Sequence, residues 1–142
     1  MRYLMKGGLM PKATTTKEVV VTCPNKTGAL AKVTTALAEG KVNIEAACCY
    51  TMEGEANFHF VTTDWAKTTE LCKRQGWTWK ENTVVCWELP HKVGTLADAT
   101  TKLAQAGVDI DYCYVTTGTG PTTKIYFSWD GISFLVLFKI GL

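Results

Sequence analysis

The sequence has few of the residues on which catalytic and metal sites usually depend. Only two of its 142 residues are histidines, and no pair of its six cysteines has the C-x-x-C spacing of a zinc or redox site. No Ser-His-Asp, Cys-His, H-E-x-x-H or paired-carboxylate arrangement stands where it can be tied to a pocket. We therefore expect no catalytic residues, no metal and no cofactor.

The sequence also lacks a strong charge excess and a long apolar run. A net charge of +2 gives no reason to expect binding to nucleic acid or to an anionic membrane. The start, residues 1–8, lacks the apolar core of a signal peptide, and the apolar residues 132–142 are too few to span a bilayer. We expect a cytoplasmic protein whose cysteines are reduced and mostly buried.

One sequence motif occurs twice in the chain. The first copy begins at Pro24 and contains Gly28, and the second begins at Pro90 and contains Gly94, an offset of 66 residues. With the same offset and no gap, roughly a third of the positions from Cys23 to Asp64 are identical to their partners. Similarity at a fixed spacing predicts a duplicated folding unit of about 65 residues, which is marginally stable alone.

The first copy has the pattern of a β-α-β-β-α-β unit. Asp64 is a suitable N-cap, and Gly40 and Gly76 are suitable helix stops. Apolar residues recur at helical spacing in the helices and alternate or cluster in the strands. The predicted strands are 18–22, 42–50, a segment around 58–60, and 77–80, and the predicted helices are 30–38 and 65–75.

The second copy repeats this pattern but ends early. Its predicted elements are a strand at 83–89, a helix around Leu96 and Leu103, and a hairpin of 108–116 with 124–129. Residues 131–142 fit a helix or a strand, with no room for a fourth strand after a helix. The predicted domains are a tail at 1–16, a first unit at 17–81 and a second unit at 82–142. We expect an α+β protein with two antiparallel sheets side by side, the second truncated after its third strand.

The repeated sequence motif resembles that of the ACT domain family. Asn25 to Leu30 and Lys41 to Ile44 match that family's turn after the first strand and the opening of its second strand. In the second copy the same segments are His91 to Leu96 and Gly107 to Ile110. The resemblance covers about residues 17–130. It implies a ferredoxin-like fold, a small stand-alone tandem protein, and side-by-side pairing of units.

The resemblance also implies that a small molecule, most often an amino acid, binds at the junction between two units. Carried over, the binding positions are Asn25, Gly28, Ala29, Asn43 and Ile44 in the first copy. Those of the second copy are His91, Gly94 and Asp109, where the acidic Asp109 would repel a ligand carboxylate but accept from an ammonium group.

Most of these residues also suit a purely structural role in a turn or a helix cap. Asn25 also suits a turn or a helix cap, both glycines suit a tight turn, and Asn43 suits the turn into a strand. His91 fits a turn as well. His59 has no visible partner in its strand, so we expect it at the surface or on a sheet face.

Three functions follow from these features. The leading one is a non-enzymatic regulatory protein that binds an amino acid and forms a homo-oligomer, because an incomplete sheet edge favours association. The second is a small enzyme on the same scaffold, with Cys23 beside His91 as the most plausible pair. The third is an oligomerisation or interaction module with vestigial pockets.

Overall fold

The computed structural model describes residues 12–130, which divide into two compact units. The first unit is residues 17–82, and the second is residues 12–16 together with 83–130. The described residues hold six strands and three helices, so the α+β class is confirmed. The predictions made for residues 1–11 and 131–142 lie outside the described residues.

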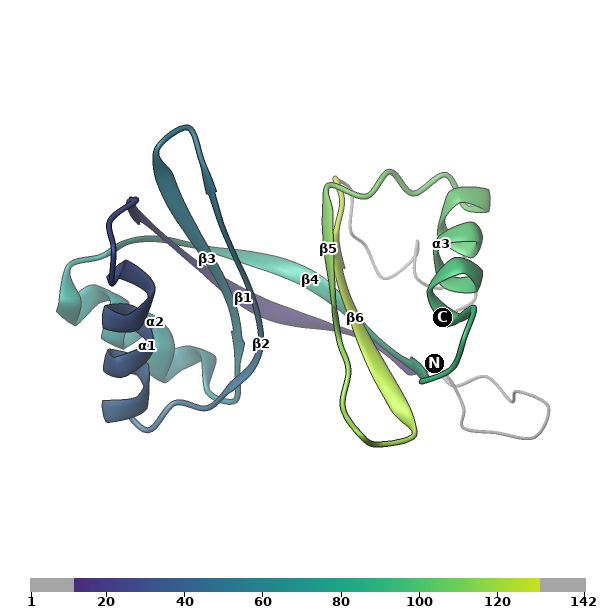
Figure 1. Ribbon diagram of the computed structural model, residues 1–142, viewed down its shortest axis with the longest axis horizontal. Helices are drawn as coiled ribbons and strands as arrows, with labels where there is room; N and C mark the ends of the chain where they lie inside the picture. Colours follow the sequence, from purple (N-terminus) through teal and green to yellow (C-terminus); the bar gives the residue numbers. More distant parts are fainter. Residues whose placement is uncertain (1–11, 131–142) are drawn as a thin grey trace. The chain divides into compact units, whose positions relative to one another are not determined.

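The first unit has the predicted β-α-β-β-α-β order. Its complete elements are α1 (Ala29–Glu39), β2 (Ile44–Met52), β3 (Glu55–Thr62) and α2 (Trp65–Gln75). It also contains the end of β1 (Lys12–Pro24) and the start of β4 (Thr78–Pro90). The strand order is β2-β3-β1-β4, and α1 and α2 lie on the same face of the sheet (Figure 1).

The core of the first unit forms between this sheet face and the two helices. Val19 and Val21 of β1 pair in register with Phe60 and Phe58 of β3, which places their side chains on one face. Leu37 of α1 is among the helical residues buried against them. As predicted, Asp64 caps α2, its side chain accepting a hydrogen bond of 3.0 Å from the Lys67 N–H.

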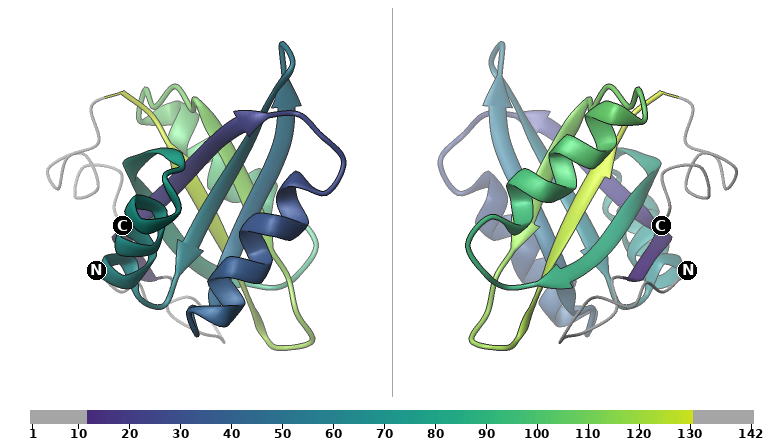
Figure 2. Two further views of the ribbon diagram at one scale, coloured as in Figure 1. Left: turned by 90° about the vertical axis from the view of Figure 1, so that its left-hand side faces the viewer. Right: turned by 90° about the vertical axis from the view of Figure 1, so that its right-hand side faces the viewer.

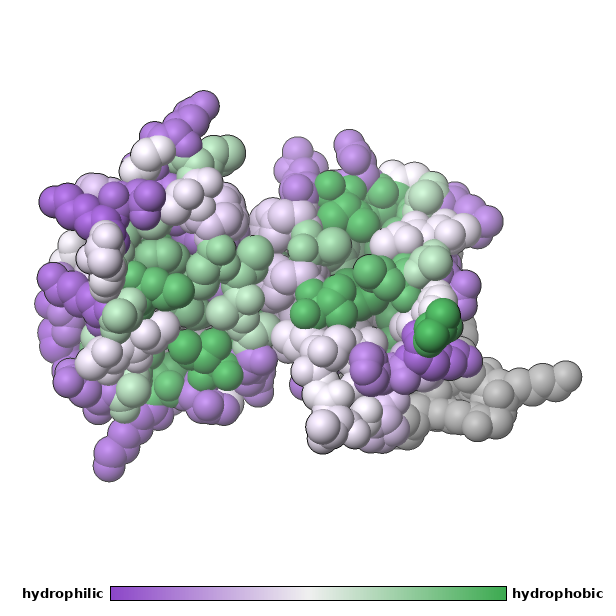
Figure 3. Space-filling model, viewed as in Figure 1, coloured by the Kyte–Doolittle hydropathy of each residue, from purple (hydrophilic) through white to green (hydrophobic). Residues whose placement is uncertain are grey.

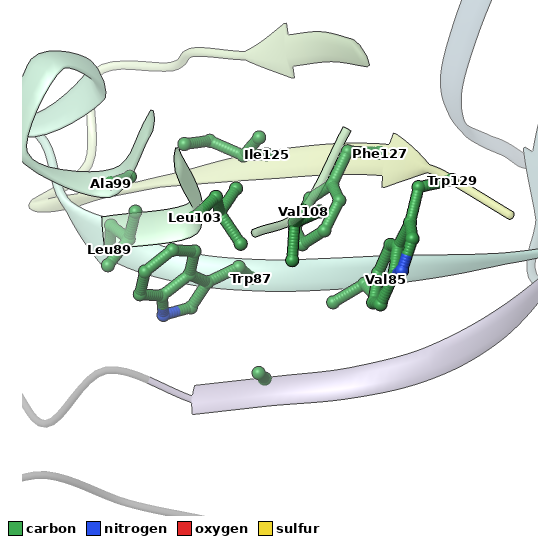
Figure 4. Packing of buried hydrophobic residues seen from close by; sticks show 10 residues of the cluster. Val85, Trp87, Leu89, Ala99, Leu103, Val108, Ile125, Phe127 and Trp129 are labelled. Atoms are coloured by element: carbon green, nitrogen blue, oxygen red, sulfur yellow. The ribbon is translucent and has the colours of Figure 1, made fainter. Parts of the chain in front are cut away.

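The second unit contains most of β4 with α3 (Thr95–Gln105), β5 (Tyr112–Thr116) and β6 (Thr122–Ser128). The predicted hairpin is confirmed, since β5 and β6 pair antiparallel from Tyr112↔Ser128 to Thr116↔Lys124. Figure 2 shows α3 lying across the sheet. Leu103 of α3 packs with Trp87 of β4 and Phe127 of β6 in the core (Figure 4).

The structure corrects the predicted tail at residues 12–16. These residues form the start of β1 and belong to the second unit, where Ala13 is buried in the core cluster of that unit. Because β1 neighbours β4 in the strand order, this short segment supplies the strand beside β4 that the repeat lacked. The second unit is therefore not truncated at this edge.

Two further predictions about the strands and cysteines are corrected. No break separates the predicted strands 77–80 and 83–89, because β4 runs through Glu81 and Asn82 as one strand. All six cysteines are free, but only Cys72 is buried, and Cys49 and Cys113 are exposed.

Among residues 12–130, no helix is long and apolar enough to cross a membrane.

The placement of Ala13 predicts that a charge there destabilises the protein. Ala13→Asp should lower the free energy of unfolding by about 2–4 kcal/mol, because a short carboxylate would be buried among apolar side chains. The control is Thr14→Asp, since Thr14 is exposed. Urea unfolding measures both changes, and equal stability of the two variants would show that residues 12–16 do not form part of the core.

Candidate ligand-binding site

The turn between β1 and α1 presents backbone and amide groups at the start of a helix. The Asn25 N–H donates to the Gly54 carbonyl at 3.0 Å, which ties the turn to the β2–β3 hairpin while the Asn25 side chain stays exposed. Gly28 is the N-cap of α1, with φ of 88°, a conformation that favours glycine. The Ala29 N–H donates to the Lys26 carbonyl at 3.0 Å. Because no side chain caps α1, the N–H groups of Leu30 and Ala31 remain at the positive end of the helix dipole without a side-chain acceptor.

A cavity of about 380 Å³ adjoins this turn. Asn25, Gly28 and Ala29 line it on one side, and residues 49–51 of β2 line it on the other. Leu30 contributes an apolar surface and is 38% exposed. Figure 3 shows apolar atoms gathered on this face of the first unit with hydrophilic residues around its outer rim. The cavity can therefore hold an apolar group beside a carboxylate.

The structure does not bring Asn43 and Ile44 to this cavity within one unit. Both lie beyond the other end of α1, an 11-residue helix and hence about 16 Å long. The Asn43 carbonyl accepts from the Thr63 N–H at 3.0 Å, at the opposite end of the β2–β3 pair from Gly54. Ile44 is half-buried at the start of β2 and packs on the core.

The predicted residues of the second copy are separated in the same way. His91 and Gly94 lie at the turn before α3, where the His91 N–H donates to the Pro121 carbonyl at 2.9 Å and Gly94 caps α3 with φ of 91°. Asp109 lies beyond the other end of α3. There it lines a cavity of about 310 Å³ together with Asp111 and Asp130. Three carboxylates make this cavity unfavourable for an anion.

Comparison with known protein families explains the arrangement of the first unit. Residues 17–64 match the ACT domain family. The first unit contains an ACT domain. The match ends at residue 64, so a second ACT domain in the chain stays a prediction. No curated protein sequence matches the chain.

Solved structures share the fold across most of the chain. Protein BT0572 from Bacteroides thetaiotaomicron superposes with a TM-score of 0.80 and 23% identity, covering 89% of each chain. The ligand-free regulatory subunit of aspartate kinase from Thermus thermophilus gives a TM-score of 0.64 at 14% identity, covering 92% of this chain and 93% of its own. Aspartokinase alpha and beta subunits give 0.64 at 18% identity, covering 90% and 95%.

Sequence reasoning missed the contribution of β2 to the cavity of the ACT domain. Residues 49–51 lie on a strand whose only neighbour in the described residues is β3, so their outer edge is unpaired. Although much of Cys49 is exposed, burial of its thiol raises its pKa, and the adjacent Cys48 raises it further. Cys49 is therefore a neutral wall of the cavity at pH 7. Alternation in β2 identified the strand but gave no sign that it was an edge.

His59 is on a sheet face, but it is buried and has partners. Its Nδ1 lies 2.9 Å from Oε1 of Glu18, and its Nε2 lies 3.2 Å from the Tyr50 hydroxyl. Glu18 is 0% exposed and also accepts from the Asn82 side chain at 3.2 Å. The four residues form a polar network on the face of the first unit's sheet that Val19 and Val21 do not use. Nothing in the sequence around His59 indicated these contacts between strands.

This network predicts unequal effects for its two ends. His59→Ala should lower the free energy of unfolding by about 2–4 kcal/mol, because it removes the imidazole from a carboxylate that is shielded from water. Tyr50→Phe should cost only about 0.5–1 kcal/mol, since the tyrosine is 41% exposed and water can replace its hydrogen bond. Denaturant unfolding measures the free energy of unfolding of both variants. Equal losses of stability would show that the buried Glu18–His59 contact is no stronger than the Tyr50–His59 contact.

The cysteines should differ sharply in reactivity. Burial raises the pKa of the Cys72 thiol to about 11, and Cys72 is 0% exposed. At pH 8 about 0.1% of Cys72 would then be thiolate, the form that reacts. Alkylation of the folded protein by iodoacetamide, followed by mass spectrometry, should modify the exposed Cys113 long before Cys72. Similar rates at both positions would show that Cys72 is accessible and its thiol unperturbed.

Proposed function

We propose that the protein is a non-enzymatic regulator that binds a free amino acid at its ACT domain. The observation that supports this most directly is the cavity of about 380 Å³ beside the uncapped start of α1, inside the segment that matches the family. A regulatory role agrees with the solved structure of a regulatory subunit of aspartate kinase, which shares the fold.

The chemistry of the cavity suits a zwitterion. The N–H groups of Leu30 and Ala31, in the first turn of α1, lie at the positive end of the helix and line the cavity, which favours the ligand carboxylate. Asn25 offers an amide with both a donor and an acceptor. Leu30 and Phe58 provide apolar walls for a side chain. Lys26 adds the positive charge at the cavity, whose lining holds no acidic residue.

If Asn43 also binds the ligand, as we propose, one ACT domain holds only part of the site. Asn43 lies at the far end of α1, so a ligand that touches both Asn25 and Asn43 must lie between two domains. A second copy of the chain can supply Asn43 if the unpaired edge of β2 associates with it, since exposed strand edges promote association. Met52, on this edge, is 61% exposed. The proposed active form is therefore a homo-oligomer.

The second unit is the weaker candidate for the same function. Asp109 stands where the first copy has Asn43, and Asp111 and Asp130 lie in the same cavity. A ligand carboxylate would meet three negative charges there, whereas an ammonium group would be attracted. We expect this site to bind amino acids weakly or not at all.

Mixing two variants tests whether copies share the site. Asn25→Ala and Asn43→Ala should each weaken amino-acid binding by roughly tenfold or more, because each removes a hydrogen bond to a charged group. If each site uses Asn25 of one copy and Asn43 of another, refolding an equal mixture of the two variants creates some intact sites. In a dimer, about a quarter of the tight sites should return. Isothermal titration calorimetry with the amino acid found in a thermal-shift screen measures this recovery.

The control variant is Asp109→Ala, which should leave amino-acid binding by the first unit unchanged. Recovery of no tight sites would show that the site does not combine two copies. Failure of all twenty amino acids to bind the unmodified protein at millimolar concentration would reject amino-acid sensing and favour an interaction module. The enzymatic alternative, with Cys23 and His91, stays a prediction, and these residues belong to different units.

A further inference from the structure

A second cavity lies beside the start of α1, on the side away from β2. It has a volume of about 350 Å³ and lies between the end of β1, the first turns of α1 and Trp77. Val21 and Val33 form its floor and are 2% and 4% exposed. The half-buried Trp77 forms a flat apolar wall. The cavity therefore presents an apolar interior large enough for an aromatic ring.

The charge around this cavity has one sign. Lys26 and Lys32 are its only charged lining residues, and both are exposed. Within residues 12–130 neither forms an ion pair. Two such ammonium groups at the mouth of an apolar cavity attract an anion and repel a cation.

The second unit contains the same cavity in a reduced form. Its cavity of about 130 Å³ is lined by residues at the same offset of 66, including Trp87 in place of Val21 and Asp98 in place of Lys32. The indole of Trp87 is 3% exposed and occupies space that Val21 leaves empty. Asp98 reverses one of the charges, and Lys102 is a further lysine that lines only the cavity of the second unit. The two units thus share the cavity but differ in the size and charge that would select a ligand.

We propose that the cavity of the first unit is a second small-molecule site, which binds an anion with an apolar body such as an aromatic monocarboxylate. The apolar body lies against Val21, Val33 and Trp77, and the carboxylate lies at the mouth near Lys26 and Lys32. This site adjoins the proposed amino-acid site, since Lys26, Gly28 and Ala29 line both cavities. Residues of β2 line only the amino-acid cavity, whereas Val21, Val33 and Trp77 line only this one. The cavity of the second unit does not bind the same ligand.

The first experiment compares two probes of matched shape and opposite charge. Phenylacetate carries an aromatic ring and a carboxylate, whereas 2-phenylethylamine carries the same ring and an ammonium group. We expect phenylacetate to bind with a dissociation constant of about 1–10 mM, as ten non-hydrogen atoms allow. In ¹H–¹⁵N correlation spectra of the full chain, it should shift the Trp77 indole N–H and the amides of Val21 and Val33. Phenylethylamine should shift none of them.

The second experiment changes the charge without touching the core. Lys32→Asp introduces the residue type of the second copy at an exposed position, and it should weaken phenylacetate binding about five- to tenfold through loss of attraction and new repulsion. Lys67→Asp makes the same change on an exposed residue of α2 outside the cavity, and it should leave binding unchanged. Asn25→Ala should also leave it unchanged, which separates this site from the amino-acid site.

Three results would overturn the proposal. The first is the absence of shifts at Trp77, Val21 and Val33 with phenylacetate at tens of millimolar. The second is binding of 2-phenylethylamine as tightly as phenylacetate, which would show that the charge at the mouth of the cavity does not select the ligand. The third is equal affinity of the Lys32→Asp and Lys67→Asp variants. Failure of amino acids to bind in the calorimetric screen would leave this proposal unaffected, because its probe is different and its apolar interior is formed by Val21, Val33 and Trp77, which do not line the amino-acid cavity.

Discussion

The structure depends on two long strands that each serve both units. β1 gives its first five residues to the second unit and the rest to the first, and β4 does the reverse at its division after Asn82. Each unit contains a part of β4 and needs a strand beside it. The repeat supplies this strand, the end of β1, to the first unit only, whereas the second unit uses residues 12–16. Ala13 in the second core is 74 positions before Trp87, so that core closes through a contact between distant parts of the sequence. Such contacts carry a large entropy cost before they stabilise the fold.

The two copies of the repeat agree at scaffold positions and differ at positions that line cavities. The scaffold positions are retained: Gly28 and Gly94 both cap a helix in the left-handed conformation, and Leu37 and Leu103 are both 1% exposed. The positions that line the cavity beside β1 differ, since Trp87 corresponds to Val21 and Asp98 to Lys32. The Nε1 of Trp87 has no hydrogen-bond partner in the described residues, so the second unit accepts a buried unsatisfied donor where it fills its cavity. The residues of the repeat that form the scaffold are thus distinct from those that set the size and charge of its cavities.

The sequence predicted those features that depend on neighbours along the chain. The helices and the β5–β6 hairpin follow from local periodicity and turn residues such as Gly76, and the structure confirms them. Two glycines, Pro11 and three consecutive threonines predict a loose tail up to Thr16, but residues 12–16 form part of a strand. These residues form a strand because β4, which is distant in the sequence, lies beside them in the sheet. The separation of Asn25 from Asn43 by the length of α1 agrees with the helix predicted at 30–38. Their role in binding stays a prediction.

The buried polar network of the first unit also fixes how β1 pairs. Val20 lies opposite His59 in the register of β1 and β3, which places Glu18 diagonally beside the imidazole. A shift of one residue would turn Glu18 toward the face where Val33 and Leu37 pack, and would turn Val19 and Val21 away from it. Burial of a carboxylate among these apolar side chains costs several kcal/mol, whereas in the native register Glu18 has partners on β3 and β4. The run Glu18-Val-Val-Val would otherwise pair almost equally well in either register, because valines suit both faces. The single glutamate therefore selects the alignment that brings Pro24 level with Glu55, and with it the turn that borders both cavities of the first unit.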